Sequence, residues 1–167
     1  MHKKQWQHTF DFNLDTLVNA RAARYENPEW WKEIKESQIL QQEEKDGLLY
    51  IKRQVWMMIN LPSFAEKAIP NQAFEVLEES WYDKTKNEMH LKTTNGSYTK
   101  YFEFHEDSHY YISGEHESKR DVKVELEVKV PLVGRRIEKM AADEFKKQSD
   151  KDKEVIDQYV NNLSKST

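Results

Sequence analysis

Apolar and polar residues alternate with a period of two along much of this chain, which is the pattern of half-buried strands. In residues 122–130, valine or leucine at every even position alternates with a charged residue at every odd position. Such a strand has one face on a core and the other in water. Residues 4–12 alternate in the same way, and the apolar face carries Trp6, His8, Phe10 and Phe12.

Turn residues divide the intervening sequence into further strands. Asp46-Gly47 predicts a tight hairpin, and Asn95-Gly96 and residues 106–108 predict two more turns. Between 109 and 130 the pattern fits either one long bulged strand or two strands split near Ser118. The other expected strands are residues 38–44, 48–59, 74–82, 87–94 and 97–105. We therefore expect an antiparallel sheet of about seven strands.

Helical spacing predicts helices at both ends of the sheet. Asn13 caps a stripe that includes Leu14, Leu17, Val18, Arg21, Ala22 and Tyr25. Asn27-Pro28 predicts a second short helix, and a capping box at Ser63 predicts one or two helical turns. Pro131 ends the sheet, and a long helix is expected at about 133–163. Its apolar stripe becomes polar at Gln148 and Asp152.

Composition limits the classes of protein that fit. The chain has 167 residues, of which 37% are hydrophobic and 34% charged, so we expect a single domain over residues 1–167. A formal net charge of −4 gives no general attraction to nucleic acid. The chain has no cysteine, no apolar leader and no run of about 18 apolar residues. We expect a cytoplasmic protein without a transmembrane segment; its oligomeric state stays open.

One segment carries a family resemblance. Residues 128–139, Val-Lys-Val-Pro-Leu-Val-Gly-Arg-Arg-Ile-Glu-Lys, resemble the junction between the last strand and the long helix in an uncharacterised bacterial family. Residues 60–62 and 79–81 are similar to that family as well. The family is one of the START-like superfamily, also called SRPBCC or birch-pollen-allergen-like. The resemblance implies an α+β helix-grip fold, in which a curved antiparallel sheet surrounds the long C-terminal helix, with two short helices after the first strand.

The resemblance also implies a function class. A helix-grip fold has an apolar cavity between sheet and helix, so we expect non-catalytic binding or carrying of a hydrophobic or amphipathic small molecule, for example a lipid. A cyclase-like or dehydratase-like enzyme using the same cavity is an alternative, and so is an interaction module with a collapsed cavity. Fold alone does not decide among them.

The expected cavity residues come from apolar faces and from one arginine. Arg53 interrupts the apolar face of strand 48–59, and a buried guanidinium needs a partner. That partner is either a ligand carboxylate or phosphate, or Glu78 or Glu79, unless Arg53 lies at a wet rim. The tryptophans and methionines fit either a cavity lining or core packing. The expected ligand-binding residues are Arg53, Val55, Met57, Phe64, Trp81, Val124, Val128, Met140 and Phe145.

No motif predicts catalysis, a metal or a cofactor. The chain has no glycine-rich phosphate loop, no zinc-protease motif and no nucleophile elbow. His105 and His109 would be about 13 Å apart in one strand, so they share a metal only if a tight turn folds between them. We interpret them as part of a solvated turn. Residues 60–73, which hold two prolines, are either the entrance to the cavity or a fixed plug.

Overall fold

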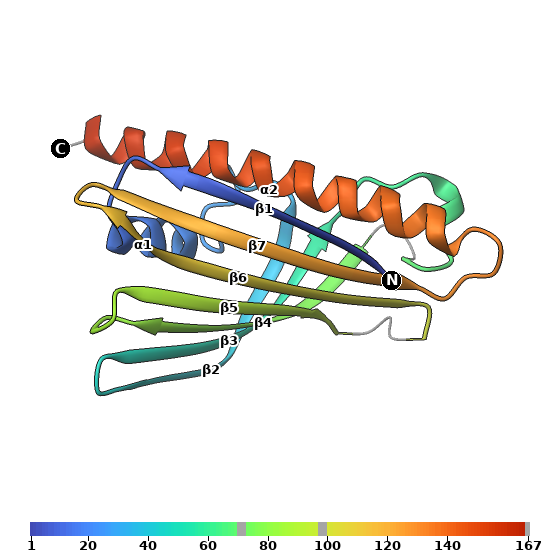
Figure 1. Cartoon of the computed structure of the whole chain (residues 1–167), viewed down its shortest axis with the longest axis horizontal. Coiled ribbons are helices and arrows are strands. Elements are labelled where there is room, and N and C mark those ends of the chain that lie inside the picture. The colour runs from blue at the N-terminus through green and yellow to red at the C-terminus, as the bar shows by residue number, and fades with distance from the viewer. Residues whose placement is uncertain (70–72, 97–99, 166–167) are drawn as a thin grey trace.

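A curved sheet and one long helix form the body of the molecule (Figure 1). The computed structural model describes residues 1–69, 73–96 and 100–165. All strand pairs are antiparallel, and the seven-stranded sheet has the order β1-β7-β6-β5-β4-β3-β2. The chain therefore enters the sheet at one edge, crosses to the opposite edge, and returns strand by strand to pair β7 with β1.

The elements follow the expected order. The sheet consists of β1 (His2–Phe10), β2 (Ile34–Lys45), β3 (Leu48–Met58), β4 (Ala73–Asp83), β5 (Glu88–Asn95), β6 (Phe102–Gly114) and β7 (Glu117–Val128). The helices are α1 (Leu14–Ala23), the short 3-10 helix η1 (Ser63–Ala65) and α2 (Gly134–Lys165). The predicted helix-grip fold is thus confirmed.

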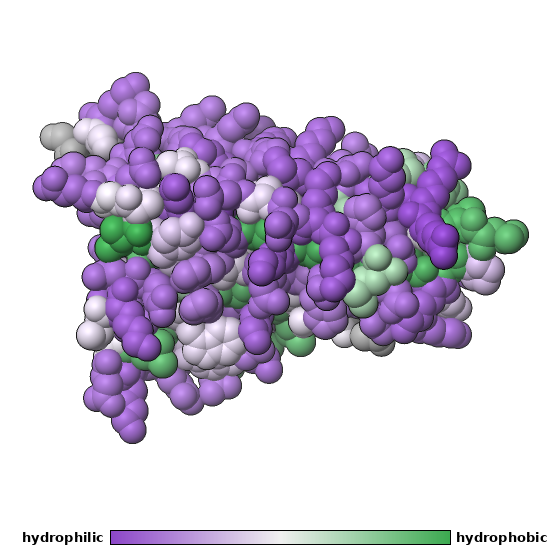
Figure 2. Space-filling view, viewed as in Figure 1, coloured by the Kyte–Doolittle hydropathy of each residue, from purple (hydrophilic) through white to green (hydrophobic). Residues whose placement is uncertain are grey.

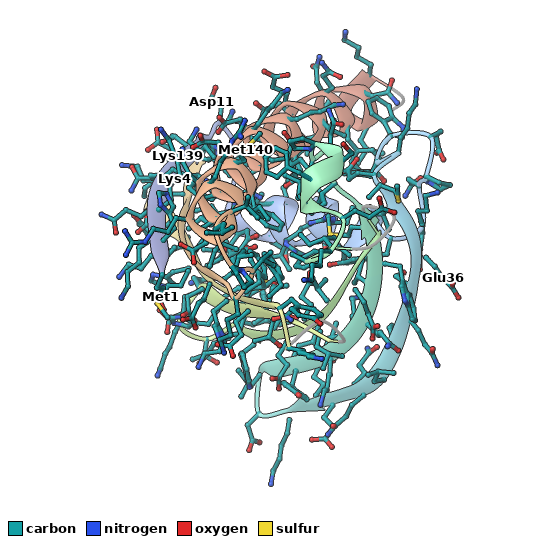
Figure 3. The ribbon with its side chains drawn as sticks, turned by 90° about the vertical axis from the view of Figure 1, so that its right-hand side faces the viewer. Met1, Lys4, Asp11, Glu36, Lys139 and Met140 are labelled. Atoms are coloured by element: carbon teal, nitrogen blue, oxygen red, sulfur yellow. The ribbon has the colours of Figure 1, made fainter. Side chains whose placement is uncertain are left out.

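Alternation decides which side chains meet the helix. The expected inward face of β7 is buried, and that of the first strand segment is buried at His8 and Phe10 and half-buried at Trp6 and Phe12. Viewed from one end, the sheet curls around one side of α2, and side chains fill the space between them (Figure 3). Glu36, on β2, lies on the outer side of that curl, far from the helix. The core therefore lies between the concave face of the sheet and α2.

Local chemistry explains the tightest turn and the first cap. Asp46 and Gly47 both have positive φ, 53° and 81°, as a two-residue hairpin with the twist of its strands requires. The Asn13 side chain accepts a hydrogen bond from the Thr16 amide at 2.9 Å and so caps α1. Both features were predicted from the sequence.

Two predicted elements are wrong. The second short helix after Pro28 does not form; the chain makes turns there because Trp31 is buried and β2 already begins at Ile34. The predicted turn at 106–108 is also wrong, because β6 continues through it and turns only after Gly114. The segment 109–130 therefore belongs to two strands, which are separated at residues 115–116. The expected strand start at Ser97 lies outside the described residues.

Two hydrogen bonds hold the junction between β7 and α2, one within the backbone and one from the backbone to a side chain. The Gly134 amide donates to the Val130 carbonyl at 2.9 Å. The Val128 amide donates to the Glu138 carboxylate at 2.9 Å, which ties the end of the sheet to the first turns of the helix. Leu132, in the loop between them, is fully exposed. Figure 2 shows a mostly hydrophilic face, with apolar side chains gathered at the end where this loop lies.

Candidate functional site

A cavity of about 80 Å³ lies between the sheet and α2. Its apolar walls are Met57, Phe74, Val76, Phe104, Val122 and Phe145. Its polar walls are Arg21, Arg24, Glu33, Glu78, Thr93, Glu106, Tyr110, Arg120, Gln148, Ser149 and Asp152. The cavity holds several waters or one compact polar group, whereas drug-sized ligands occupy pockets of roughly 300–1,000 Å³.

Arg21 and Glu78 form the first buried ion pair of this site. Both Arg21 terminal nitrogens donate to the Glu78 carboxylate, at 3.1 and 3.0 Å, and Arg21 Nε donates to the Tyr110 hydroxyl at 2.9 Å. Tyr25 also donates to Glu78. Burial acts to lower the pKa of Arg21, but Glu78, Tyr110 and Tyr25 together outweigh it, and the pKa lies well above its usual value. Burial raises the pKa of Tyr25 to about 12.

A second buried ion pair joins β7 to α2. Arg120 donates to Asp152 at 2.8 Å, and the Trp31 indole donates to the other Asp152 oxygen at 2.9 Å. Burial acts to raise the pKa of Asp152, but Arg24 and Arg120 outweigh it and hold the pKa at about 2. Asp152 is therefore an anion at every ordinary pH.

His8 completes this network as a neutral ring. Its Nδ1 accepts from Arg120 at 3.0 Å, so its Nε2 carries the proton and donates to Asp150 at 2.8 Å. Burial and the Arg120 charge lower the pKa of His8, which favours the same neutral form.

Arg24 differs from the other two buried arginines. It is nine-tenths buried, and its Nε atom has no hydrogen-bond partner among the described residues. Burial acts to lower the pKa of Arg24, but Asp152 and Tyr25 outweigh it, and the guanidinium stays charged. A buried donor without a partner is costly and uncommon, so this N–H is a position that a ligand or a water is expected to fill.

Two acceptors also face the cavity. The Gln148 side-chain oxygen is buried and finds no hydrogen-bond partner in the part of the chain that the structure describes, while the side-chain amide nitrogen donates to the Met58 carbonyl at 3.3 Å. Glu106 accepts one hydrogen bond from Ser108 at 2.8 Å. Burial raises the pKa of Glu106, which favours its protonated form. The cavity thus offers both donors and acceptors.

An open groove of about 400 Å³ adjoins the cavity and shares Glu33 and Gln148 with it. Its other walls are Met58, Ile59, Asn60, Glu144, Lys147 and Lys151. Gln148 therefore borders both the groove and the cavity that the buried arginines line. The groove begins where the expected entrance segment 60–73 begins, of which residues 70–72 lie outside the described part.

The ligand-binding residues predicted from the sequence lie in several different environments. Met57 and Phe145 line the cavity. Val55, Val124 and Val128 are buried in the surrounding core.

Arg53 is half-buried and lies opposite Glu78 across β3 and β4, but its guanidinium stacks on the Tyr25 ring at 4.2 Å. Arg21, rather than Arg53, holds the Glu78 carboxylate.

The remaining three lie away from the cavity walls. Phe64 is half-buried beneath the Arg136 guanidinium, 4.6 Å from its ring centre. Met140 is half-buried on α2. Trp81 lies on the opposite face of the sheet, against Tyr50 at 5.4 Å, because odd positions of β4 point away from the helix.

Sequence reasoning missed the three buried arginines of this site, although three signals were present. Arg21 falls within the apolar stripe of α1, and Arg120 occupies an inward position of β7. The polar interruption of the long helix at Gln148 and Asp152 is the third signal, since both residues face the cavity.

Fold and site together define a START-like helix-grip protein. Similar solved structures are a Thermus thermophilus protein (TM-score 0.69, 10% identity, 98% of this chain and 99% of that one) and a START superfamily protein from Mycobacterium smegmatis (0.63, 17%, 98% and 99%). The ZhuI aromatase/cyclase from a Streptomyces species is a third (0.66, 9%, 96% and 94%). At these identities the likeness concerns the fold alone.

The sequence narrows the class further. A match of residues 15–166 to the family model shows that the chain belongs to the PRELI-like family. The resemblance to the START-like superfamily is thereby confirmed. No curated protein matches the sequence. Among the described residues, no helix is long and apolar enough to cross a membrane.

Proposed function

We propose that this protein binds a small amphipathic molecule by its anionic head group, without catalysis. The head, a carboxylate or a phosphate, occupies the cavity and accepts a hydrogen bond from Arg24. The apolar tail lies in the adjoining groove against Met58 and Ile59. The observation that carries the proposal is the buried Arg24 Nε–H, which has no partner and belongs to a residue of the cavity wall.

Several features support an anion at this position. Arg21 and Arg120 are already neutralised by Glu78 and Asp152, so Arg24 is the cation that lacks a direct hydrogen-bonded carboxylate. A guanidinium suits carboxylate and phosphate oxygens, because it presents a rigid set of donors. If Glu106 is protonated, its O–H donates to the same head group.

The groove supports an amphipathic ligand rather than a free anion. Its volume of about 400 Å³ lies in the range of ligand pockets, and Met58 and Ile59 supply apolar contact beside the cavity. Lys147 and Lys151 stand at the groove and attract a negative head group, although Glu33 and Glu144 oppose them. The Gln148 side chain must turn aside for the head to pass.

The proposal is tested with octanoate, octyl phosphate and octanol, which share one tail and differ in the head. Calorimetry should show that the two anions bind more tightly than octanol. Arg24→Gln should weaken both anions by about tenfold or more and leave octanol unchanged, because a hydrogen bond to a charged group contributes about 1.5–3 kcal/mol. Arg135→Gln, at an exposed position of α2, is the matched control and should change nothing.

Stability separates a binding effect from a folding effect. Arg24→Gln removes an unpartnered buried N–H but also one of the two cations that stabilise the Asp152 carboxylate, so the urea midpoint of the variant is measured, and unchanged octanol binding shows that the site is still folded. Equal affinity for all three probes, or anion binding unaffected by Arg24→Gln, would overturn the proposal. If none of the probes binds, the module with a collapsed cavity becomes the better explanation, in keeping with the small cavity volume.

A further inference from the structure

Three metal-ligating side chains converge on the outer face of the sheet, away from the cavity. His90 of β5 lies directly opposite His109 of β6 in the strand register. Their rings stack with centroids 4.4 Å apart and planes inclined by only 7°. Glu88 precedes His90 by two residues, so it projects from the same face of β5.

The carboxylate lies between the two imidazoles. One Glu88 oxygen is 3.3 Å from His109 Nε2, and the other is 4.0 Å from His90 Nε2. Ligand atoms of all three residues lie within 4.8 Å of one another. The side chains are accessible to an incoming ion, since Glu88 and His109 are about one-third exposed and His90 is more than half exposed.

We propose that Glu88, His90 and His109 form a binding site for a divalent transition metal ion, Zn²⁺ in the first instance. Two imidazole nitrogens and one carboxylate oxygen are a ligand set that zinc accepts, with three protein ligands and a water in the fourth position. Alkaline-earth ions prefer oxygen ligands, so they fit this set poorly.

The distances fit an ion after a small side-chain adjustment. Zinc bonds to nitrogen and oxygen are about 2.0–2.2 Å, so atoms around one tetrahedral ion lie about 3.3–3.5 Å apart. The Glu88–His109 pair already has this separation, while His90 Nε2 is 4.0 Å from the other Glu88 oxygen, so His90 must move closer and its ring must tilt out of the stack with His109. The backbone needs no change, because the ligands come from adjacent paired strands in the middle of the sheet.

Other side chains on the same face lie next to the three proposed ligands. Tyr111 packs against His109, with ring centroids 4.9 Å apart. Trp81 is the partner of His90 on β4 and lies on the same face. Asp121 is the partner of His109 on β7, but one of its oxygens already accepts from Gln7 at 2.7 Å. Three ligands therefore remain available to the ion.

Zinc calorimetry of the metal-free protein, in a buffer that does not chelate, tests the proposal. The parent should bind one Zn²⁺, and His90→Asn and His109→Asn should each weaken binding at least tenfold. His105→Asn is the matched control, because His105 is an exposed histidine on the same face of β6 and is not a member of the cluster. It should bind zinc as the parent does.

A second measurement guards against changes in folding. Zinc should raise the melting temperature of the parent and of His105→Asn, and should leave that of His109→Asn unchanged. No zinc binding by the parent would overturn the proposal. Equal loss of affinity in the His105 variant would also overturn it, as would tight binding that survives both His90→Asn and His109→Asn.

Discussion

Gly134, at the start of α2, allows the long helix to approach the end of the sheet. A Cβ added to Gly134 would lie 2.4 Å from the Val128 carbonyl oxygen and 3.4 Å from the carbonyl carbon. Both contacts are with backbone, so no side chain can turn aside. We predict that Gly134→Ala destabilises the protein, although helix propensity alone predicts a gain of about 0.5–1 kcal/mol.

The size of the effect follows from what must move. Relieving the contact displaces either the end of β7 or the first turn of α2, and overpacking of this kind costs about 1–3 kcal/mol. The displacement also strains the bond from the Val128 amide to the Glu138 carboxylate, which contributes about 1.5–3 kcal/mol. Adding the two costs and subtracting the propensity gain gives a net loss of about 1.5–5.5 kcal/mol.

Urea unfolding followed by circular dichroism measures this loss. The matched control is Gly114→Ala in the β6–β7 hairpin, where an added Cβ meets only the Glu117 side chain, at 3.3 Å. The control should stay within about 0.5 kcal/mol of the parent. A Gly134→Ala variant as stable as the parent, or more stable, would show that the junction relaxes freely and that the argument from close contact is wrong.

Two further predictions concern the cavity walls. Phe145 stacks on Phe104 with ring centroids 4.4 Å apart, but it also borders the cavity. Phe145→Ala should therefore lower the free energy of unfolding in urea by about 2–3 kcal/mol, less than the roughly 3–5 kcal/mol of a fully packed phenylalanine. An unchanged urea midpoint would contradict this. The Asp152 pKa of about 2 lies below its ordinary value of 3.8, so its contribution of about 2 kcal/mol is present above pH 4 and is lost as the pH falls toward 2. Asp152→Asn should flatten the unfolding free energy over that pH range, and parallel pH profiles for variant and parent would contradict the assignment.

Much of the fold could be predicted because its signals are local. The period of two in residues 122–130 depends only on neighbouring side chains, and so do the caps and the Asp46-Gly47 turn. The same signals failed where buried tertiary contacts compete with them. Residues 106–108 resemble a turn by composition, yet Ser108 is buried and its hydroxyl donates a hydrogen bond to Glu106 within β6.

The site was decided by the tertiary structure. Arg21, Glu78, Arg120 and Asp152 come from four elements, and only the strand order and the packing of α2 bring them together. A charged residue on an apolar face shows from sequence that a partner is needed, but it does not show which partner.

Strand register likewise decided which polar residues meet on the outer face of the sheet. His90 and His109 are separated by 19 positions in the sequence and become neighbours because β5 and β6 pair with these two residues opposite each other. A slip of one residue would place them on opposite faces of the sheet. Sequence by itself therefore determined which faces are apolar, whereas strand register and helix packing determined which polar groups meet.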